Sequence, residues 1–248
     1  MAAELGEEKR NAVAAHLQDL VLDGRDTEEF LQELVIFSAS ILSAPGNKLF
    51  CGITVARDKR QTTVANNDPK ALALDELQCE FGDGPSLTAI RTRTTVHVPD
   101  VGGEHRRPEY IDAVSAHGIG SILGIPLKLE GTATAALNLY SPLPHGFTRE
   151  DITRAEAFAE QAAKTLRLEL RLAQLSNANK DMAQAMKTRT IIDLAVGAIM
   201  AQNRCSQDAA LRILHRASSN RNIKLLDVAA SVITAITDNT HVWTHFDQ

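Results

Sequence analysis

The sequence predicts an α+β domain, with an antiparallel sheet flanked by helices, followed by a long helix and an all-α three-helix bundle. Short strand-like runs between residues 49 and 140 alternate with helical segments and are joined by hairpins, which is typical of antiparallel α+β domains. From Arg149 to the end there is no proline, and apolar residues recur there at helical spacing. The second half is therefore expected to be all helical.

The strands and helices of the first part can be placed by their turn and cap residues. Helices are expected over 7–22 and from a cap at Asp26 or Thr27 to about residue 43. A helical stretch over 70–93 is interrupted at 81–85, and another helix is expected over 107–117. The predicted strands are 49–56, 62–65, 95–98, 121–129 and 133–140, with hairpin tips at 58–60 and 130–131.

Composition limits the class of protein. A chain of 248 residues forms one large or two modest domains, and 44% hydrophobic residues suffice for ordinary cores. No apolar stretch approaches the roughly 18 residues of a membrane span, and the polar N-terminus is not a signal peptide. Three distant cysteines, Cys51, Cys79 and Cys205, give no zinc spacing and no disulfide framework. We expect a cytoplasmic protein without a membrane partner or metal.

The long helix carries a pattern that predicts self-association. Thr148 and Asp151 form a capping box at its start, and it is expected to run to about Gln202, with a weak point at 176–179. Six residues follow each other at spacings of 4, 3, 4, 3 and 4, and we call them the seam: Leu168, Leu172, Leu175, Asn179, Met182 and Met186. The seam predicts a parallel homodimer. The alternative is that this face packs on the chain's own sheet.

Three apolar stripes define the bundle. The end of the long helix contributes Ile192, Ala195, Val196 and Ile199, and the second helix, capped by Ser206, contributes Ala210, Leu211, Leu214 and Ala217. The third contributes Leu225, Val228, Ala229, Val232, Ile233 and Ile236. Gly197 costs roughly 1 kcal/mol in a helix interior, and close approach of another helix is the expected compensation.

Charge divides the chain. Residues 187–224 hold seven basic residues, namely Lys187, Arg189, Arg204, Arg212, Arg216, Arg221 and Lys224, and two acidic ones, a balance of 7 − 2 = +5 within a chain of −5. Residues 1–175 hold 18 basic and 25 acidic side chains, which gives −7, and residues 176–248 hold eight and six, which gives +2. A basic module on an acidic carrier favours a polyanionic partner. Any one of these residues could instead be an ordinary solvated charge.

The segments RTIIDLAVGAIM (189–200), SQDAALRILH (206–215) and NRNIKLLDVA (220–229) resemble the ANTAR domain, a three-helix RNA-binding module of bacterial transcription antiterminators. The resemblance implies that the module binds RNA with two short hexanucleotide stem-loops and prevents a terminator hairpin from forming. It implies RNA contacts by the seven basic residues. Val196 departs from the Lys that many members have, and Leu211 from a common Phe.

The segments DELQCEFGDGPSLTAI (75–90), VHVPD (96–100), ILGIPLKL (122–129) and ALNLYS (136–141) resemble a GAF domain of the kind that precedes ANTAR modules in actinobacteria. Ser86 departs from the cysteine often found in that subgroup. The resemblance implies a sensor for a small-molecule effector, whose identity the sequence does not indicate. The expected parts are an N-terminal extension at 1–26, the GAF domain at 27–170, a coiled-coil linker at 168–186 and the ANTAR domain at 180–240.

The sequence also bears on other functions. Catalysis finds little support, because Gly82-Asp-Gly84 lacks the Lys-Ser/Thr of a phosphate-binding loop and Ser86 does not lie in a Gly-x-Ser-x-Gly elbow. The chain is expected not to be an enzyme. The alternatives are a DNA-binding regulator of the helix-turn-helix kind and a GAF-containing signalling protein without RNA binding. The target transcripts and any upstream kinase or partner are left open by the sequence.

Overall fold

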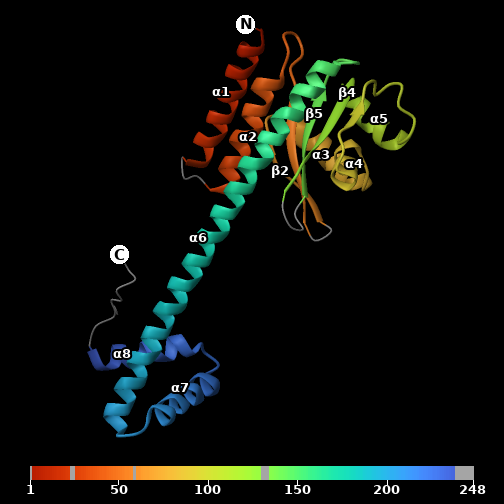
Figure 1. Ribbon diagram of the computed structural model, residues 1–248. Helices are drawn as coiled ribbons and strands as arrows, with labels where there is room; N and C mark the ends of the chain where they lie inside the picture. The colour runs from red at the N-terminus through yellow and green to blue at the C-terminus, as the bar shows by residue number, and fades with distance from the viewer. Residues whose placement is uncertain (1, 23–25, 58–59, 130–133, 238–248) are drawn as a thin grey trace. The chain divides into compact units, whose positions relative to one another are not determined.

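The computed structural model describes residues 2–22, 26–57, 60–129 and 134–237. The chain divides into two compact units, Met1–Ala173 and Gln174–Gln248 (Figure 1). The hairpin tips expected at 58–60 and 130–131 lie largely outside the described residues, as do residues 238–240. Within the described ranges, no helix has the length and apolar character needed to cross a bilayer.

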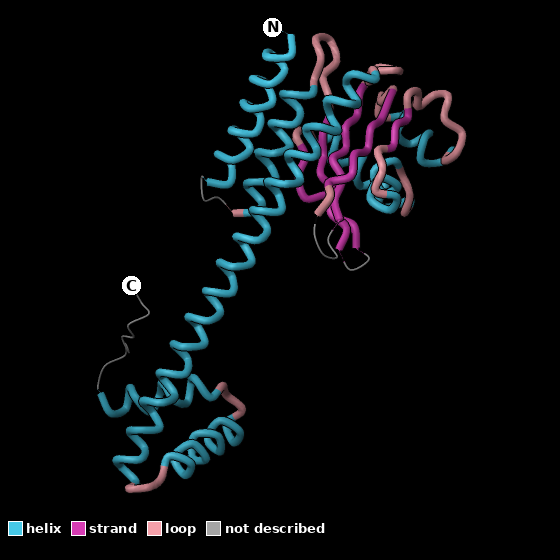
Figure 2. The backbone as a smooth tube through the Cα atoms, in the orientation of Figure 1, coloured by secondary structure: helices cyan, strands magenta, loops and turns pink. Residues whose placement is uncertain are grey.

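The first unit is built on a five-stranded antiparallel sheet of strand order β2-β1-β5-β4-β3. Figure 2 shows the strands of this sheet in magenta among the cyan helices. The strands are β1 (Phe50–Arg57), β2 (Arg60–Asn66), β3 (Val96–Val98), β4 (Ser121–Leu127) and β5 (Thr134–Ser141). Between the paired strands β4 and β5, Leu123 lies opposite Leu139 and Ile122 lies opposite Tyr140. Because side chains alternate across a strand, these two pairs lie on opposite faces of the sheet. The expected α+β fold is confirmed.

One face of the sheet is covered by α1 (Ala2–Leu22), α2 (Thr27–Leu42) and the first part of α6 (Arg149–Asn203) (Figure 1). Asp26 caps the N-terminus of α2, and its carboxylate accepts from the backbone N–H groups of Glu28 and Glu29. The N-terminus of α6 has the expected capping box: the N–H of Thr148 donates to Asp151 Oδ2 at 3.0 Å, and the N–H of Asp151 donates to Thr148 Oγ1 at 3.1 Å. The first helix begins earlier than residue 7, where its apolar spacing starts.

The other face packs against α3 (Pro69–Phe81), α4 (Pro85–Thr92) and α5 (Pro108–Ala116). The interruption expected at 81–85 separates α3 from α4, since Gly82 adopts φ of +64° and Pro85 opens the next helix. The helical stretch expected over 70–93 is therefore two helices, which pack on the same face of the sheet.

A buried polar cluster lies between α3 and β5. The hydroxyl of Tyr140 donates to Asp75 Oδ1, Asn138 Nδ2 donates to the same atom at 2.8 Å, and Gln78 Nε2 donates to the Tyr140 oxygen at 2.6 Å. Burial, followed by the Asp75 charge, raises the pKa of Tyr140 well above its usual value. Ser86 is fully buried and its N–H donates to Gln78 Oε1 at 2.8 Å. Ser86 is thus part of this interior hydrogen-bond network.

The second unit is a three-helix bundle. The end of α6 packs with α7 (Gln207–Arg221) and α8 (Leu225–Thr237) around a core of eight buried side chains: Ala195, Val196, Ile199, Ala210, Leu214, Val228, Ala229 and Ile233. The expected stripes are confirmed at those positions, and Ile192, Leu211, Ala217, Leu225 and Val232 are partly buried against them. Ile236 is different, because it lies in the last turn of α8 and is 46% exposed.

Within the single chain, the close helix approach expected at Gly197 is not found. Gly197 is exposed, and a Cβ added there would meet no atom within 4 Å. Among the described residues, no other helix comes within 4 Å of that position, so packing inside this part of the chain does not offset the cost of a glycine in a helix interior.

Candidate nucleic-acid interface

Helix α7 presents its arginines outward because its opposite side forms the bundle core. Ser206 caps its N-terminus and accepts from the N–H of Ala209 at 3.4 Å. Ala210 and Leu214 are buried. At 100° per residue, Arg212 and Arg216 lie on the far side from them, one turn apart, and both are exposed.

The turns at the two ends of α7 add three more cations. Arg204, in the turn after α6, has φ of 50°, and Asn222, which caps the end of α7, has φ of 52°. The hydroxyl of Ser218 donates to the carbonyl of Ile223 at 2.7 Å and ties the second turn to the helix end. These turns fix the backbone at Arg204, Arg221 and Lys224, all of which are exposed.

We call Arg204, Arg212, Arg216, Arg221 and Lys224 the α7 cluster. Within the described part of the chain, none of the five lies within ion-pair distance of a carboxylate. Their charges are therefore available to a ligand, whereas an arginine already paired to a carboxylate would first have to exchange that partner.

The other two residues expected to contact RNA, Lys187 and Arg189, lie on α6. Lys187 is half-buried and interacts with a neighbour. Arg189 Nε lies 3.6 Å from Asp193 Oδ2, one turn further on, with 85% of its side chain exposed. At about 1.5 Å per residue, Arg189 is about 21 Å along the helix before Asn203. The structure thus groups five of the seven residues around α7 and leaves Lys187 and Arg189 on the preceding helix.

Two further polar residues share the outer face of α7. His215 and Ser219 are exposed and lie three residues after Arg212 and Arg216 respectively. Sequence reasoning missed them because it selected for charge, although their helical spacing from the arginines was readable. Asp208 is a carboxylate on the same face, one turn before Arg212. This face therefore combines two arginines, hydrogen-bonding groups and one opposing charge.

Val196 is 4% exposed and belongs to the bundle core. Its departure from the Lys of many ANTAR members therefore changes the packing of α6 and takes no charge from the exposed α7 face.

The seam is exposed in the single chain. Leu168, Leu172, Leu175, Met182 and Met186 are between 44% and 64% exposed, and Asn179 is also exposed. Buried positions of α6 between Ala155 and Leu166 instead face the sheet. The alternative that the seam packs on the chain's own sheet is therefore not what this structure has.

The comparisons with known proteins agree with the division of the chain into two units. The family model of the GAF domain matches residues 26–166, and that of the ANTAR domain matches residues 180–233. The first match covers more than half of the chain. The chain belongs to the GAF domain family, and with its ANTAR domain it has the architecture of a GAF–ANTAR regulator. Both families are regulatory: the GAF domain is a sensory domain and the ANTAR domain an RNA-binding one.

Solved GAF domains are similar in structure to the first unit. The phycoerythrobilin-bound GAF domain of a cyanobacterial phytochrome is 11% identical, with a TM-score of 0.50 over 66% of this chain and 97% of that one. The GAF domain of a phosphoenolpyruvate-protein phosphotransferase from Coxiella burnetii is 19% identical, with a TM-score of 0.49 over 68% and 96%. The likeness concerns the fold alone. No curated protein matches the chain.

Proposed function

We propose that the chain is a signal-responsive RNA-binding transcription antiterminator that acts in the cytoplasm on nascent transcripts. The observation that carries the proposal is the coincidence of the ANTAR match at 180–233 with the exposed, unpaired α7 cluster. Arginine and lysine neutralise phosphates, and arginine also stacks on unpaired loop bases. RNA with two hexanucleotide stem-loops is the proposed ligand, and its stabilisation would prevent a terminator hairpin.

The proposal includes a homodimer and a ligand-responsive GAF domain. Two copies joined along the seam would offer two ANTAR modules to two stem-loops. The proposed parts are an extension at 1–26, the GAF domain at 27–170, a coiled-coil linker at 168–186 and the ANTAR domain at 180–240. A small-molecule effector of the GAF domain would act through α6. It can shift the population of dimer arrangements only if it binds the two states unequally.

Thiol chemistry gives little support to an enzymatic alternative. Burial, and then the nearby Asp75 charge, raises the pKa of both Cys51 and Cys79 above the usual value of a thiol. The thiolate is the nucleophilic form, so both groups are weak nucleophiles at neutral pH.

The decisive experiment is RNA binding by Arg212→Ala with Arg216→Ala in the full chain. Neither side chain contributes to the core, so circular dichroism should show an unchanged fold. We expect tight binding to paired hexaloop RNA to be lost near physiological salt. If both arginines contact phosphates, the logarithmic salt dependence should become shallower by about 1.4–1.8, from 0.7–0.9 per contact.

Two controls separate local contact from net charge. Lys48→Ala with Arg149→Ala also removes two positive charges, but from the first unit, and should leave the RNA affinity unchanged. Asp208→Asn removes the carboxylate beside Arg212 and should strengthen binding. A folded double arginine variant that binds RNA like the parent would remove the α7 face from the proposal. Preference for duplex DNA over hexaloop RNA would favour the DNA-binding alternative.

A further inference from the structure

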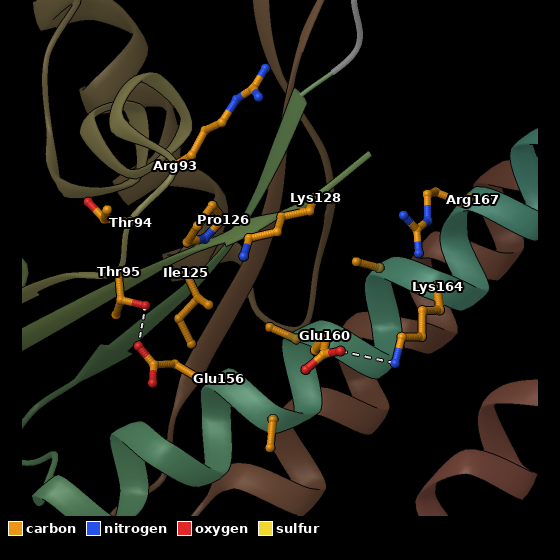
Figure 3. Close-up of a pocket in the computed structure, with 13 residues that line it drawn as sticks. Arg93, Thr94, Thr95, Ile125, Pro126, Lys128, Glu156, Glu160, Lys164 and Arg167 are labelled. Atoms are coloured by element: carbon orange, nitrogen blue, oxygen red, sulfur yellow. Dashed lines mark hydrogen bonds and ion pairs between the residues drawn. The ribbon is translucent and has the colours of Figure 1, made fainter. Parts of the chain in front are cut away.

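A cleft of about 600 Å³ opens in the first unit, at the β3 edge of the sheet. Its walls are the loop before β3 (93–95), the end of β4 with the residue that follows it (125–128) and the α6 segment 156–167 (Figure 3). We call it the edge cleft. It lies on the α6 side of the sheet, since Ile125 packs into the core shared with that helix, whereas the cluster around Asp75 lies on the other side.

The edge cleft exists because β3 is short. It pairs with β4 only as far as Val96 with Gly124, while β4 continues beside β5 to Leu127. Pro126 has no N–H to offer a further strand. On the α6 side, Ala159 and Ala163 are buried alanines at the base of the cleft. A strand that ends early and small helix side chains together leave the volume unfilled.

The floor of the edge cleft is apolar and its rim is basic. Ile125, Ala159 and Ala163 are at most 4% exposed and form part of the floor. Four cations line the cleft, namely Arg93 from the loop, Lys128 from the end of β4, and Lys164 and Arg167 from α6. Figure 3 shows Lys128 on the strand wall and Lys164 and Arg167 on the helix wall.

Two carboxylates also line the cleft, and both have partners. Thr95 Oγ1 donates to Glu156 Oε1 at 2.5 Å, and Lys164 Nζ lies 3.0 Å from Glu160 Oε1. Within the described residues, Arg93, Lys128 and Arg167 have no carboxylate at ion-pair distance. The lining balance is 4 − 2 = +2, inside a region of residues 1–175 that totals −7.

We propose that the edge cleft binds a small organic molecule that carries two or more phosphate groups beside an apolar body. A volume of about 600 Å³ lies within the range of small-molecule sites, roughly 300–1,000 Å³. Arg93, Lys128 and Arg167 form no ion pair with a carboxylate among the described residues, although the Lys128 charge helps to lower the pKa of Glu160. Cations of this number favour a ligand with more than one negative charge, and arginine and lysine are the usual phosphate ligands. The buried apolar floor accounts for the organic part. A ligand held there contacts α6 directly at 156–167.

The test uses the full chain and calorimetric titration with ATP in the absence of magnesium. Lys128→Ala with Arg167→Ala removes one cation from each wall and should weaken ATP binding by about tenfold or more. Lys48→Ala with Arg149→Ala removes the same charge outside the cleft and should change the affinity by less than about twofold. Thermal melts establish that each variant is folded.

A second variant tests the cavity without touching any charge. Ala157 is exposed and lines the cleft, so Ala157→Phe should narrow it while the fold is kept. We expect ATP binding to weaken, and inorganic triphosphate, which has no apolar body, to bind the parent more weakly than ATP does. Adenosine alone should not bind, because it lacks the phosphates.

Several results would overturn the proposal. They are no ATP binding at millimolar concentration, equal affinity for ATP and triphosphate, or unchanged ATP affinity in both cleft variants. Loss of RNA affinity in Lys128→Ala with Arg167→Ala, without binding of the small anions, would make the edge cleft an RNA contact instead. The test is independent of the RNA proposal, since Arg212→Ala with Arg216→Ala should bind ATP like the parent.

Discussion

Gly197 allows a sharp test of what this helix contacts. Alanine is favoured over glycine by about 0.5–1 kcal/mol in a helix interior, because glycine loses more backbone freedom on folding. The added methyl would meet no atom within 4 Å, so no steric cost opposes the gain. Gly197→Ala should therefore stabilise the second unit by about 1 kcal/mol. For a unit of this size, that corresponds to a rise in midpoint of about 4–8 °C.

Hydrogen exchange followed by mass spectrometry can measure this change in the full chain. Peptides from α7 and α8 should exchange about fivefold more slowly if they open with the whole unit, since 1 kcal/mol is about a factor of five. Ala185→Gly is the matched reverse change at an exposed position of the same helix. It should have the opposite effect of similar size.

Faster exchange in Gly197→Ala would refute the reasoning, because the methyl must then meet an atom that the single chain does not contain. If the destabilisation grows with protein concentration, that atom belongs to a second copy. At 100° per residue, Gly197 lies within about 20° of the direction of Met186, so a dimer contact along the seam could reach it. If stability rises while RNA affinity falls, the RNA approaches the helix there.

Three further outcomes are expected. Leu172→Glu with Leu175→Glu should convert the proposed dimer to a monomer in light scattering, because it places charge in the seam; an unchanged mass would rule the seam out. Leu214→Ala should destabilise the bundle by about 2–5 kcal/mol in denaturant unfolding, and it should abolish RNA binding without removing a charge. The neighbouring Ile213 is 45% exposed, so Ile213→Ala should cost much less stability. Partial burial alone would raise the pKa of Asp83, but hydrogen bonds from Arg107, the Gly84 N–H and Arg91 lower it to about 2. The contribution of Asp83 to the free energy of unfolding is therefore present above about pH 4 and is lost as pH falls from 4 to 2. Because 41% of that side chain is exposed, Asp83→Asn should cost only about 1 kcal/mol at pH 7 and should reduce the loss of stability between pH 4 and 2; an unchanged acid profile would contradict this.

Local interactions made much of the fold readable from the sequence. The capping box of Thr148 and Asp151, the cap at Ser206 and the break at Gly82 each depend on residues within a few positions, so their residue types predict the element ends. The apolar stripes of the bundle follow from helical periodicity alone. The exposure of Arg212 and Arg216 followed from the same periodicity, because the buried side of α7 determines its outer side.

Tertiary structure decided what depends on residues far apart in the chain. Gly197 was predicted to lie against another helix, and only the packed bundle reveals open space there. The contact of Asp75 with Tyr140 joins residues 65 positions apart. The edge cleft brings together Arg93, Lys128 and Arg167, which are ordinary surface charges in the sequence. Their convergence follows from where β3 stops pairing and from the side of the sheet that α6 covers, and no local sequence pattern records either.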